Sequence, residues 1–414
     1  MPGADRFAPL APIDLAQAQP NIAKPARPLT ALIVTPSLHA GAADSGTVQL
    51  VRILASAGHR SVVVSSGGRM VDDVTAAGAT FIAMGVATTN PIRIARNALA
   101  LARIAREQRC DLIHAHARAP GWSAYYAAKR AGIPFLTSWY KGFRDQNVFK
   151  HLYNGVMARG DSVVAISDQI AELVVERYKT PWERIAVIPA SVDFDRFDPA
   201  RVSQVRIDAV RNSWGVQADT KIILVVGRML RRKGHHVVVA SVQRLKEMGL
   251  KDFMCVFVGE DQGKSRYSGE LWDLVLSTGT TEVIRMAGPT DDLPAAFAAA
   301  TVVVSAAIQA EGLQRAILEA EAMAKPVVVS DLGAGPDAVL APPAVAEDRM
   351  TGLRFSAGDS VALATALVRL FSLPPAGRAA IGTRGRAWVL ANFNTAAAAE
   401  PTLRLYEQIT ARRP

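Results

Sequence analysis

The chain has 414 residues, of which half are apolar and a fifth are charged, as in a soluble globular protein. This composition excludes a disordered tail protein, a collagen-like fibre and a pure coiled coil, and the length predicts two or three domains. A net charge of +10 favours acidic partners such as phosphates, nucleic acid or an anionic membrane surface. The two cysteines, Cys110 and Cys255, lie in apolar contexts, so we expect buried thiols in a reducing compartment.

The first 28 residues are rich in Ala and Pro and lack an apolar targeting core, so we expect a mobile arm. No window of about 18 residues is apolar throughout and free of charge, so we expect no transmembrane helix. These patterns predict a cytoplasmic protein whose membrane contact is limited to its surface.

Short apolar runs alternate with helical patterns from residue 29 to about residue 200. The expected strands are 31–36, 61–65, 81–84, 111–115, 135–138 and 162–166. The expected helices are 47–57, 91–108 and 123–131, and a turn rich in Gly and Ala covers 41–46. Such alternation predicts βαβ units and a mostly parallel sheet.

The same rhythm restarts after a polar stretch at 199–219. The expected strands are 221–227, 253–259, 283–287, 301–305 and 326–330, with helices at 236–248, 293–299 and 313–324. The sequence therefore predicts two doubly wound domains, 29–200 and 201–378, followed by a helical segment, 379–414, that is interrupted at 392–394. Because ligands bind at the carboxyl ends of parallel strands, two such domains predict a site in the cleft between them.

Two carboxylates, Glu311 and Glu319, are spaced by two helical turns after the expected strand 301–305. Glu311 is expected in the loop before the helix, and Glu319 on the helix itself. The amides of that helix N-terminus are able to hold an anion. The alternative is a solvated helix whose early Glu residues complement the helix dipole.

A basic turn, Gly227 to Gly234, leaves the expected strand 221–227 directly. Its four cations are Arg228, Arg231, Arg232 and Lys233. At a strand's carboxyl end they face the cleft, where a diphosphate needs positive charge. The alternative is a solvated basic turn.

Small residues at 41–46 allow a ligand to approach the backbone closely. The turn lacks the G-x-G-x-x-G pattern of dinucleotide-binding proteins. The stretch 259–265 has one residue too few between its glycines for a P-loop, so we reject that motif.

The stretch 91–160 contains twelve Lys or Arg against three Asp or Glu, with Trp and Tyr interleaved. Basic and aromatic residues suit an anionic membrane surface, although solvated helix faces have the same composition. His114 and His116 alternate on an expected strand and so share a face, but no further ligand cluster joins them, and we expect no metal site.

Taken together, these elements resemble the retaining GT-B glycosyltransferases of family four, over residues 29–406. The resemblance is carried by 111–116 (DLIHAH), 165–167 (AIS), 188–193 (IPASVD), 226–228 (VGR), 233–234 (KG) and the Glu-x7-Glu motif at 311–319 with its continuation EAM to 323. It implies two Rossmann-like domains facing across a cleft and a C-terminal helix that returns to the first domain. The stretches 118–122 and 139–143 are similar to an envelope-polysaccharide branch of the family.

The resemblance also implies residue roles. Glu311 contacts hydroxyls of the donor sugar, Glu319 holds the ribose, and Arg228 and Lys233 bind the donor diphosphate, so the expected catalytic group is Glu311, Arg228 and Lys233. Further expected donor contacts are Gly227, Gly312, Leu313 and Gln314. The expected phosphate and acceptor loop is Gly41, Ala42, Ala43, Asp44 and Ser45, and His116, Tyr140 and Lys141 are expected on the acceptor or sugar side.

The implied activity is hexosyl transfer with retention, from a UDP- or GDP-linked sugar to an envelope glycan or lipid-linked acceptor at the inner membrane face. Cleaving the sugar–diphosphate bond leaves negative charge, which cations and a helix N-terminus stabilise without a metal ion or other cofactor. Front-face transfer through an oxocarbenium-like state needs no protein nucleophile. No nucleic acid partner is expected, because the chain has no recognisable readout module.

The chain departs from the family at three places. Many relatives carry His in a Phe-His-Gly segment where this chain has Trp139, Tyr140 and Lys141; Gln314 replaces a frequent Gly, and 190–191 (AS) replace Asn-Gly. These changes leave two alternatives open. The chain is a GT-B protein that binds nucleotide sugar without turnover, or it is an enzyme that uses a different donor. A dehydrogenase is disfavoured by the missing dinucleotide motif.

Overall fold

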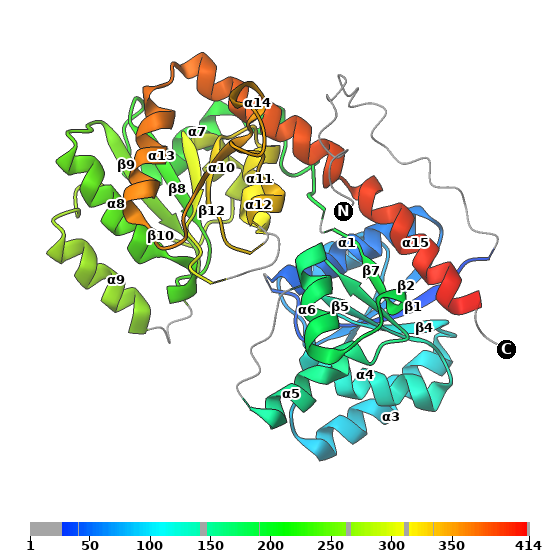
Figure 1. Cartoon of the computed structure of the whole chain (residues 1–414). Coiled ribbons are helices and arrows are strands. Elements are labelled where there is room, and N and C mark those ends of the chain that lie inside the picture. The colour runs from blue at the N-terminus through cyan, green and yellow to red at the C-terminus, as the bar shows by residue number, and fades with distance from the viewer. Residues whose placement is uncertain are drawn as a thin grey trace.

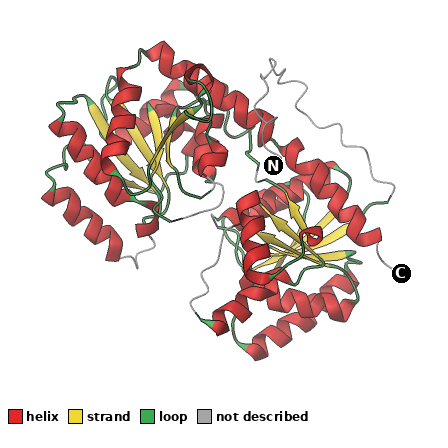
Figure 2. Ribbon diagram, viewed as in Figure 1, coloured by secondary structure: helices red, strands yellow, loops and turns green. Residues whose placement is uncertain are grey.

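The computed structural model describes residues 27–39, 41–140, 147–189, 191–261, 266–309, 314–333 and 335–411. It confirms two doubly wound domains, each a parallel sheet with helices on both faces (Figures 1 and 2). The first sheet has the strand order β3-β2-β1-β4-β5-β6-β7, and the second has the order β10-β9-β8-β11-β12-β13. Each order reverses direction beside its first strand, which is where open α/β sheets bind ligands.

The N-terminal sheet is formed by β1 (Thr30–Val34), β2 (Arg60–Ser65), β3 (Thr80–Ala83), β4 (Leu112–Ala115), β5 (Phe135–Trp139), β6 (Ser162–Ala165) and β7 (Ile185–Val187). Its helices are α1 (Ala42–Ser56), α2 (Val71–Ala76), α3 (Pro91–Glu107), α4 (Arg118–Ala131), α5 (Val148–Asn154) and α6 (Asp168–Tyr178). The central strands are buried on both faces, as continuous apolar runs predict.

The second sheet is formed by β8 (Lys221–Val226), β9 (Phe253–Val258), β10 (Ile284–Gly288), β11 (Val302–Ser305), β12 (Val327–Ser330) and β13 (Gly352–Phe355). Its helices are α7 (Gln204–Ser213), α8 (His235–Glu247), α9 (Arg266–Ser277), α10 (Leu293–Ala299), α11 (Arg315–Ala322), α12 (Gly335–Ala338), α13 (Ser360–Ser372) and α14 (Pro375–Asn392). The final helix is α15 (Thr395–Ala411).

Two helices begin earlier than the sequence predicts. Helix α1 begins at Ala42 rather than at residue 47, because two alanines and the capping carboxylate of Asp44 favour helix over an open turn. Helix α4 begins at Arg118 rather than at residue 123, with Pro120 in its first turn, where proline is tolerated. The short edge strand β7 and the terminal strand β13 were not expected at all.

The interruption at 392–394 separates two helices with different partners. Helix α14 packs in the C-terminal core through Ile381, Trp388 and Val389. Helix α15 returns to the first domain (red in Figure 1), and Leu403 and Tyr406 join its core. The predicted return of the C-terminal helix is therefore confirmed, while the predicted boundaries at residues 200 and 378 stay predictions.

The chain passes between the domains at two places that touch each other. The outgoing segment enters at Val192, and the returning segment follows α14. The Val192 N–H donates to the carbonyl of Phe393 at 2.8 Å. The two crossings thus lie side by side.

No single helix in the described part of the chain is long and apolar enough to cross a membrane. In that part, only α13 and the α14–α15 segment taken together reach the required length and hydropathy, and this pair is bent by 113°. Cys110 and Cys255 are buried, unpaired thiols, as expected. Burial, followed by the nearby charge of Asp111, raises the pKa of Cys110 to about 12, so this thiol is inert.

Candidate active site

The N-terminus of α1 lies at the carboxyl end of β1, beside the cleft. Gly41 is the N-cap, and the Asp44 carboxylate accepts the N–H groups of His39 at 3.1 Å and Gly41 at 3.0 Å. The predicted phosphate and acceptor loop is therefore the cap and first turn of a helix, which corrects the expectation of an open turn. Asp44 acts as its internal cap, so the amides of Ala42 and Ala43, rather than the carboxylate, suit an anionic ligand.

Three separate segments meet behind this turn. A Cβ atom added to Gly46 would lie 2.3 Å from the Tyr140 hydroxyl, so the tyrosine ring packs directly on the glycine. The same hydroxyl lies 3.1 Å from Nδ1 of His116, and Thr47 Oγ1 lies 2.9 Å from that nitrogen. The structure thus brings together the predicted residues His116 and Tyr140 with Gly46, the last residue of the predicted small-residue turn, and adds Thr47, which sequence reasoning missed.

His116, Tyr140 and Gly46 border a cavity of about 70 Å³ on the N-terminal domain. Its walls come from α1, the ends of β4 and β5, and α15. The guanidinium-bearing residue Arg315 of α11 contributes from the other domain. The cavity therefore opens between the two halves of the molecule.

His114 and His116 share a face, as predicted, with ring centroids 4.6 Å apart. His114 Nδ1 lies 2.7 Å from the Tyr406 hydroxyl, and its Nε2 lies 2.8 Å from Ser138 Oγ. Nδ1 of His114 thus fastens α15 to the sheet, and Nε2 links β4 to β5. Burial lowers the pKa of both histidines, that of His116 to about 4. In the described part of the chain, no group of three or more potential metal ligands gathers.

The basic turn lies at the carboxyl end of β8, as predicted. Gly227 has a φ of 158°, and the Lys233 side chain passes 3.7 Å from where a Cβ would be. Gly234 has a φ of 72°, and a Cβ there would lie 1.7 Å from the Ala306 carbonyl oxygen, so the turn is held against the loop after β11. Arg228 is exposed and Lys233 is half-buried.

One predicted cation points elsewhere. Arg231 pairs with Glu270 on α9 at 3.1 Å, although the sequence placed all four cations of the turn toward the cleft. The loop after β11 also bonds to this turn, since the Ile308 N–H donates to the Arg232 carbonyl at 2.9 Å. The turn that carries Arg228 and Lys233 is therefore joined, at Arg232 and Gly234, to residues 306–308 after β11.

Glu311, Gly312, Leu313 and Lys141 lie outside the described residues. Gln314 is the N-cap residue of α11, and its side chain is hydrogen-bonded to Ser305 Oγ at the end of β11. Glu319 is buried, and its Oε1 accepts a hydrogen bond from Arg315 Nη2 at 2.9 Å. Burial raises the pKa of Glu319, and the charge of Arg315 opposes this shift. Arg315 was missed, although its spacing of four from Glu319 could have indicated the pair.

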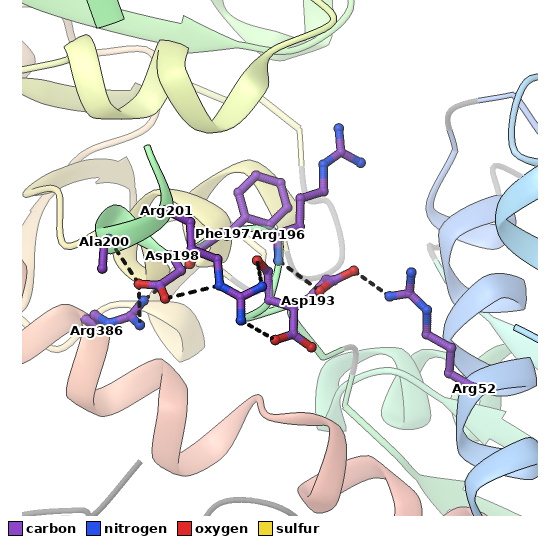
Figure 3. A network of polar contacts seen from close by, with 9 residues as sticks. Arg52, Asp193, Arg196, Phe197, Asp198, Ala200, Arg201 and Arg386 are labelled. Carbon is purple, nitrogen blue, oxygen red and sulfur yellow. Dashed lines mark hydrogen bonds and ion pairs between the residues drawn. The ribbon is translucent and has the colours of Figure 1, made fainter. Parts of the chain in front are cut away.

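An ion pair joins the first domain to the connecting segment (Figure 3). Arg52 of α1 pairs with Asp193, whose carboxylate also accepts the Arg196 N–H at 3.1 Å. Burial alone raises the pKa of Asp193, but Arg52 and then Arg196 outweigh it, and the pKa is lowered. Further along the cleft, Gln169 of α6 donates to the Gly333 carbonyl of the second domain at 2.8 Å. None of these contacts was predicted.

The two domains, with their cation turn and facing cavity, have the architecture of a GT-B glycosyltransferase. The family model for glycosyltransferase family 4 matches residues 44–196, and the model for glycosyl transferases group 1 matches residues 220–372. The chain therefore belongs to this family of glycosyltransferases.

Individual relatives agree with this assignment. The D-inositol 3-phosphate glycosyltransferase of Salinispora tropica is 28% identical over 322 residues, a match that covers 73% of this chain and 64% of that enzyme. A glycosyltransferase from Rickettsia africae has a similar structure, with a TM-score of 0.82, 28% identity, and coverage of 93% of this chain and 100% of the other. HepE from Anabaena, in complex with UDP-glucose, shares the fold with a TM-score of 0.74 and 19% identity, over 92% of this chain and 98% of that one.

Proposed function

We propose that the chain transfers a hexose-type sugar, with retention of anomeric configuration, from a UDP- or GDP-linked donor to an envelope glycan or lipid-linked acceptor. The observation that carries this proposal is that the turn bearing Arg228 and Lys233 leaves β8 and is joined to residues 306–308 after β11, while Glu319 lies on the next helix, α11. Similarity to a HepE structure that contains UDP-glucose supports the choice of donor class.

The proposed chemistry follows from the charges at this edge of the sheet. As the bond between the sugar and the diphosphate breaks, the leaving diphosphate gains negative charge. Arg228 and Lys233 stabilise that charge, and preorganised cations are effective because they need no rearrangement during the reaction. In the proposed front-face reaction the acceptor hydroxyl attacks from the side of the leaving group and gives its proton to the diphosphate. We expect this reaction to proceed without an added divalent ion, and turnover that EDTA abolishes would contradict this expectation.

Glu319 is the proposed ribose ligand. Its Oε1 is already bonded to Arg315, so a ribose hydroxyl either shares this carboxylate with Arg315 or displaces it. A buried carboxylate that accepts hydrogen bonds from both ribose hydroxyls needs a positive neighbour to stay ionised, and Arg315 supplies that charge.

The test is a thermal-shift screen with UDP-, GDP-, ADP- and CMP-sugars. A ligand at 100 times its Kd stabilises the native state by about 2.7 kcal/mol. We expect one nucleotide class to stabilise the wild type but not Arg228→Ala or Glu319→Ala. Arg231→Ala is the matched control, because this arginine lies on the same turn but pairs with α9. No shift with any nucleotide sugar would refute the proposal.

Turnover separates the proposed enzyme from a protein that only binds nucleotide sugar. Release of the nucleoside diphosphate, measured with membrane lipid extract as acceptor, identifies an enzyme. Binding of a nucleotide sugar, with no release of the nucleoside diphosphate in the presence of any acceptor, supports the binding-only alternative. The absence of the Phe-His-Gly histidine motivates this alternative. D-inositol 3-phosphate belongs in the acceptor panel, because relatives that are 27–29% identical are glycosyltransferases named for that compound.

We further propose that the N-terminal domain contacts the anionic inner face of the cytoplasmic membrane. Helices α3, α4 and α5 lie along one edge of this domain (Figure 1). On α5, Val148, Phe149 and Leu152 are 72%, 83% and 56% exposed, and Lys150 lies among them. The exposed cations of α3 extend the same basic edge. Apolar side chains framed by cations fit a surface of anionic lipids.

Vesicle flotation tests this membrane proposal. We expect binding to phosphatidylglycerol vesicles and not to phosphatidylcholine vesicles, and we expect Phe149→Asp to reduce it. Binding that ignores lipid charge, or that survives the substitution unchanged, would contradict the proposal.

A further inference from the structure

The buried ring of His116 lines the cavity beside α1. The side chain is only 2% exposed, and its Nε2 makes no hydrogen bond within the described part of the chain. Buried polar atoms are nearly always hydrogen-bonded, so an unpartnered nitrogen on a ring that lines a cavity points to a group that enters from outside.

The neighbouring hydrogen bonds fix the tautomer of this ring. Thr47 Oγ1 donates its only proton to the Ala43 carbonyl at 2.8 Å, so it accepts from His116 Nδ1 at 2.9 Å. Nδ1 therefore carries the ring proton, and Nε2 presents a lone pair. The Tyr140 hydroxyl oxygen, 3.1 Å from the same Nδ1, is a second acceptor for that proton.

The charge of the ring determines which chemical group it accepts. Burial lowers the pKa of His116 to about 4, so the imidazole is neutral near pH 7. A neutral nitrogen with a lone pair accepts a hydrogen bond from a hydroxyl, and it offers nothing to a phosphate oxygen. The apolar part of the cavity wall suits the carbon that carries such a hydroxyl.

The size and position of the cavity narrow the ligand further. A cavity of about 70 Å³ has room for a hydroxyl together with its carbon. Arg315 borders the cavity and is bonded to Glu319, the proposed ribose ligand. The cavity therefore opens toward the half of the cleft that is proposed to hold the donor.

We propose that His116 Nε2 accepts a hydrogen bond from a hydroxyl of the donor sugar, and that Thr47 is a positioning residue that keeps this nitrogen unprotonated. This inference rests on the proposed function, since it assumes a nucleotide-sugar donor. Because this chain lacks the histidine that many relatives carry at the position of 139–141, the inference gives the contact with the sugar to His116.

The test compares UDP with UDP-glucose, each measured by calorimetry. His116→Asn keeps an amide where Nδ1 was and removes Nε2, whereas His116→Gln places an amide where Nε2 was. We expect His116→Asn to weaken UDP-glucose about tenfold and to leave UDP unchanged. His116→Gln should recover most of the loss.

Thr47 gives an independent variant. Thr47→Val removes the hydroxyl acceptor, so the ring proton is free to move to Nε2. We expect about threefold weaker binding of UDP-glucose, unchanged binding of UDP, and recovery in Thr47→Ser. The melting temperature without ligand identifies any variant that fails to fold.

The outcomes separate the inference from the proposed function. If the wild type binds neither UDP nor GDP, nor their glucose conjugates, the proposed function fails, and the inference falls with it. If the wild type binds a nucleotide but His116→Asn affects nucleotide and nucleotide sugar equally, or neither, the inference alone is overturned.

Discussion

The fully buried His235 makes the stability of the second domain sensitive to acid. Its ring is 0% exposed and packs edge-to-face on Phe257, with 5.2 Å between centroids. Burial, followed by the positive charge of Lys233, lowers its pKa from 6.5 to about 4. Below pH 6.5 the unfolded chain binds a proton here and the folded chain does not. The free energy of unfolding therefore falls as pH falls, by about 2 kcal/mol between pH 7.5 and 5.0.

His235→Phe removes this titration while keeping an aromatic ring against Phe257. Urea unfolding at pH 7.5 and 5.0, followed by tryptophan fluorescence, measures the change. We expect the variant to gain about 2 kcal/mol on the wild type between the two pH values. His236→Phe is the matched control, because this half-buried ring is bonded to Tyr267 at 3.0 Å and should give a smaller gain. A difference between His235→Phe and wild type that is equal at both pH values would refute the reasoning.

Three other predictions concern buried contacts. Burial raises the pKa of Glu321 well above 4.5, so the wild type loses stability relative to Glu321→Gln as pH rises above about 5. We expect the difference in unfolding free energy to grow by about 1.4 kcal/mol per pH unit while the folded carboxyl stays protonated. Urea midpoints of the two proteins that keep a constant separation would contradict this. Tyr406→Phe removes the hydrogen bond to His114 and should cost about 1–3 kcal/mol in thermal unfolding, so an unchanged melting temperature would speak against it. Gly46→Ala should displace Tyr140 and lower kcat/KM about tenfold without unfolding the chain, and unchanged kinetics would disprove the packing argument.

Periodic apolar patterns predicted most of the framework. Strands such as β1 and β8 are uninterrupted apolar runs because both faces of a parallel sheet are covered, and such runs are visible in sequence. Edge strand β7 has three residues and is only partly buried, so its pattern is too short to detect. The start of α1 was misplaced because Gly favours turns whereas Ala favours helices, so the mixed segment is ambiguous, and the deciding contact is the cap by Asp44.

The candidate site likewise contains some features that were visible in the sequence and others that were not. The basic turn was found because it leaves a recognisable strand, and the Glu-x7-Glu motif because it is contiguous. The pairing of Gly46 with Tyr140, and of Arg52 with Asp193, joins residues about 90 and 140 positions apart, and no local pattern encodes it. Arg231 was assigned to the cleft because its partner, Glu270, lies on a helix whose packing could not be read from the sequence.

The return of α15 has a consequence for biosynthesis. The core of the first domain includes Leu403 and Tyr406, which leave the ribosome only after the whole second domain. The second domain contains all its strands between residues 221 and 355 and is free to fold while translation continues. The first domain has to wait, with part of its apolar sheet face uncovered, until its last helix emerges. A nascent chain stalled at residue 392 should therefore expose apolar surface on the domain that was synthesised first.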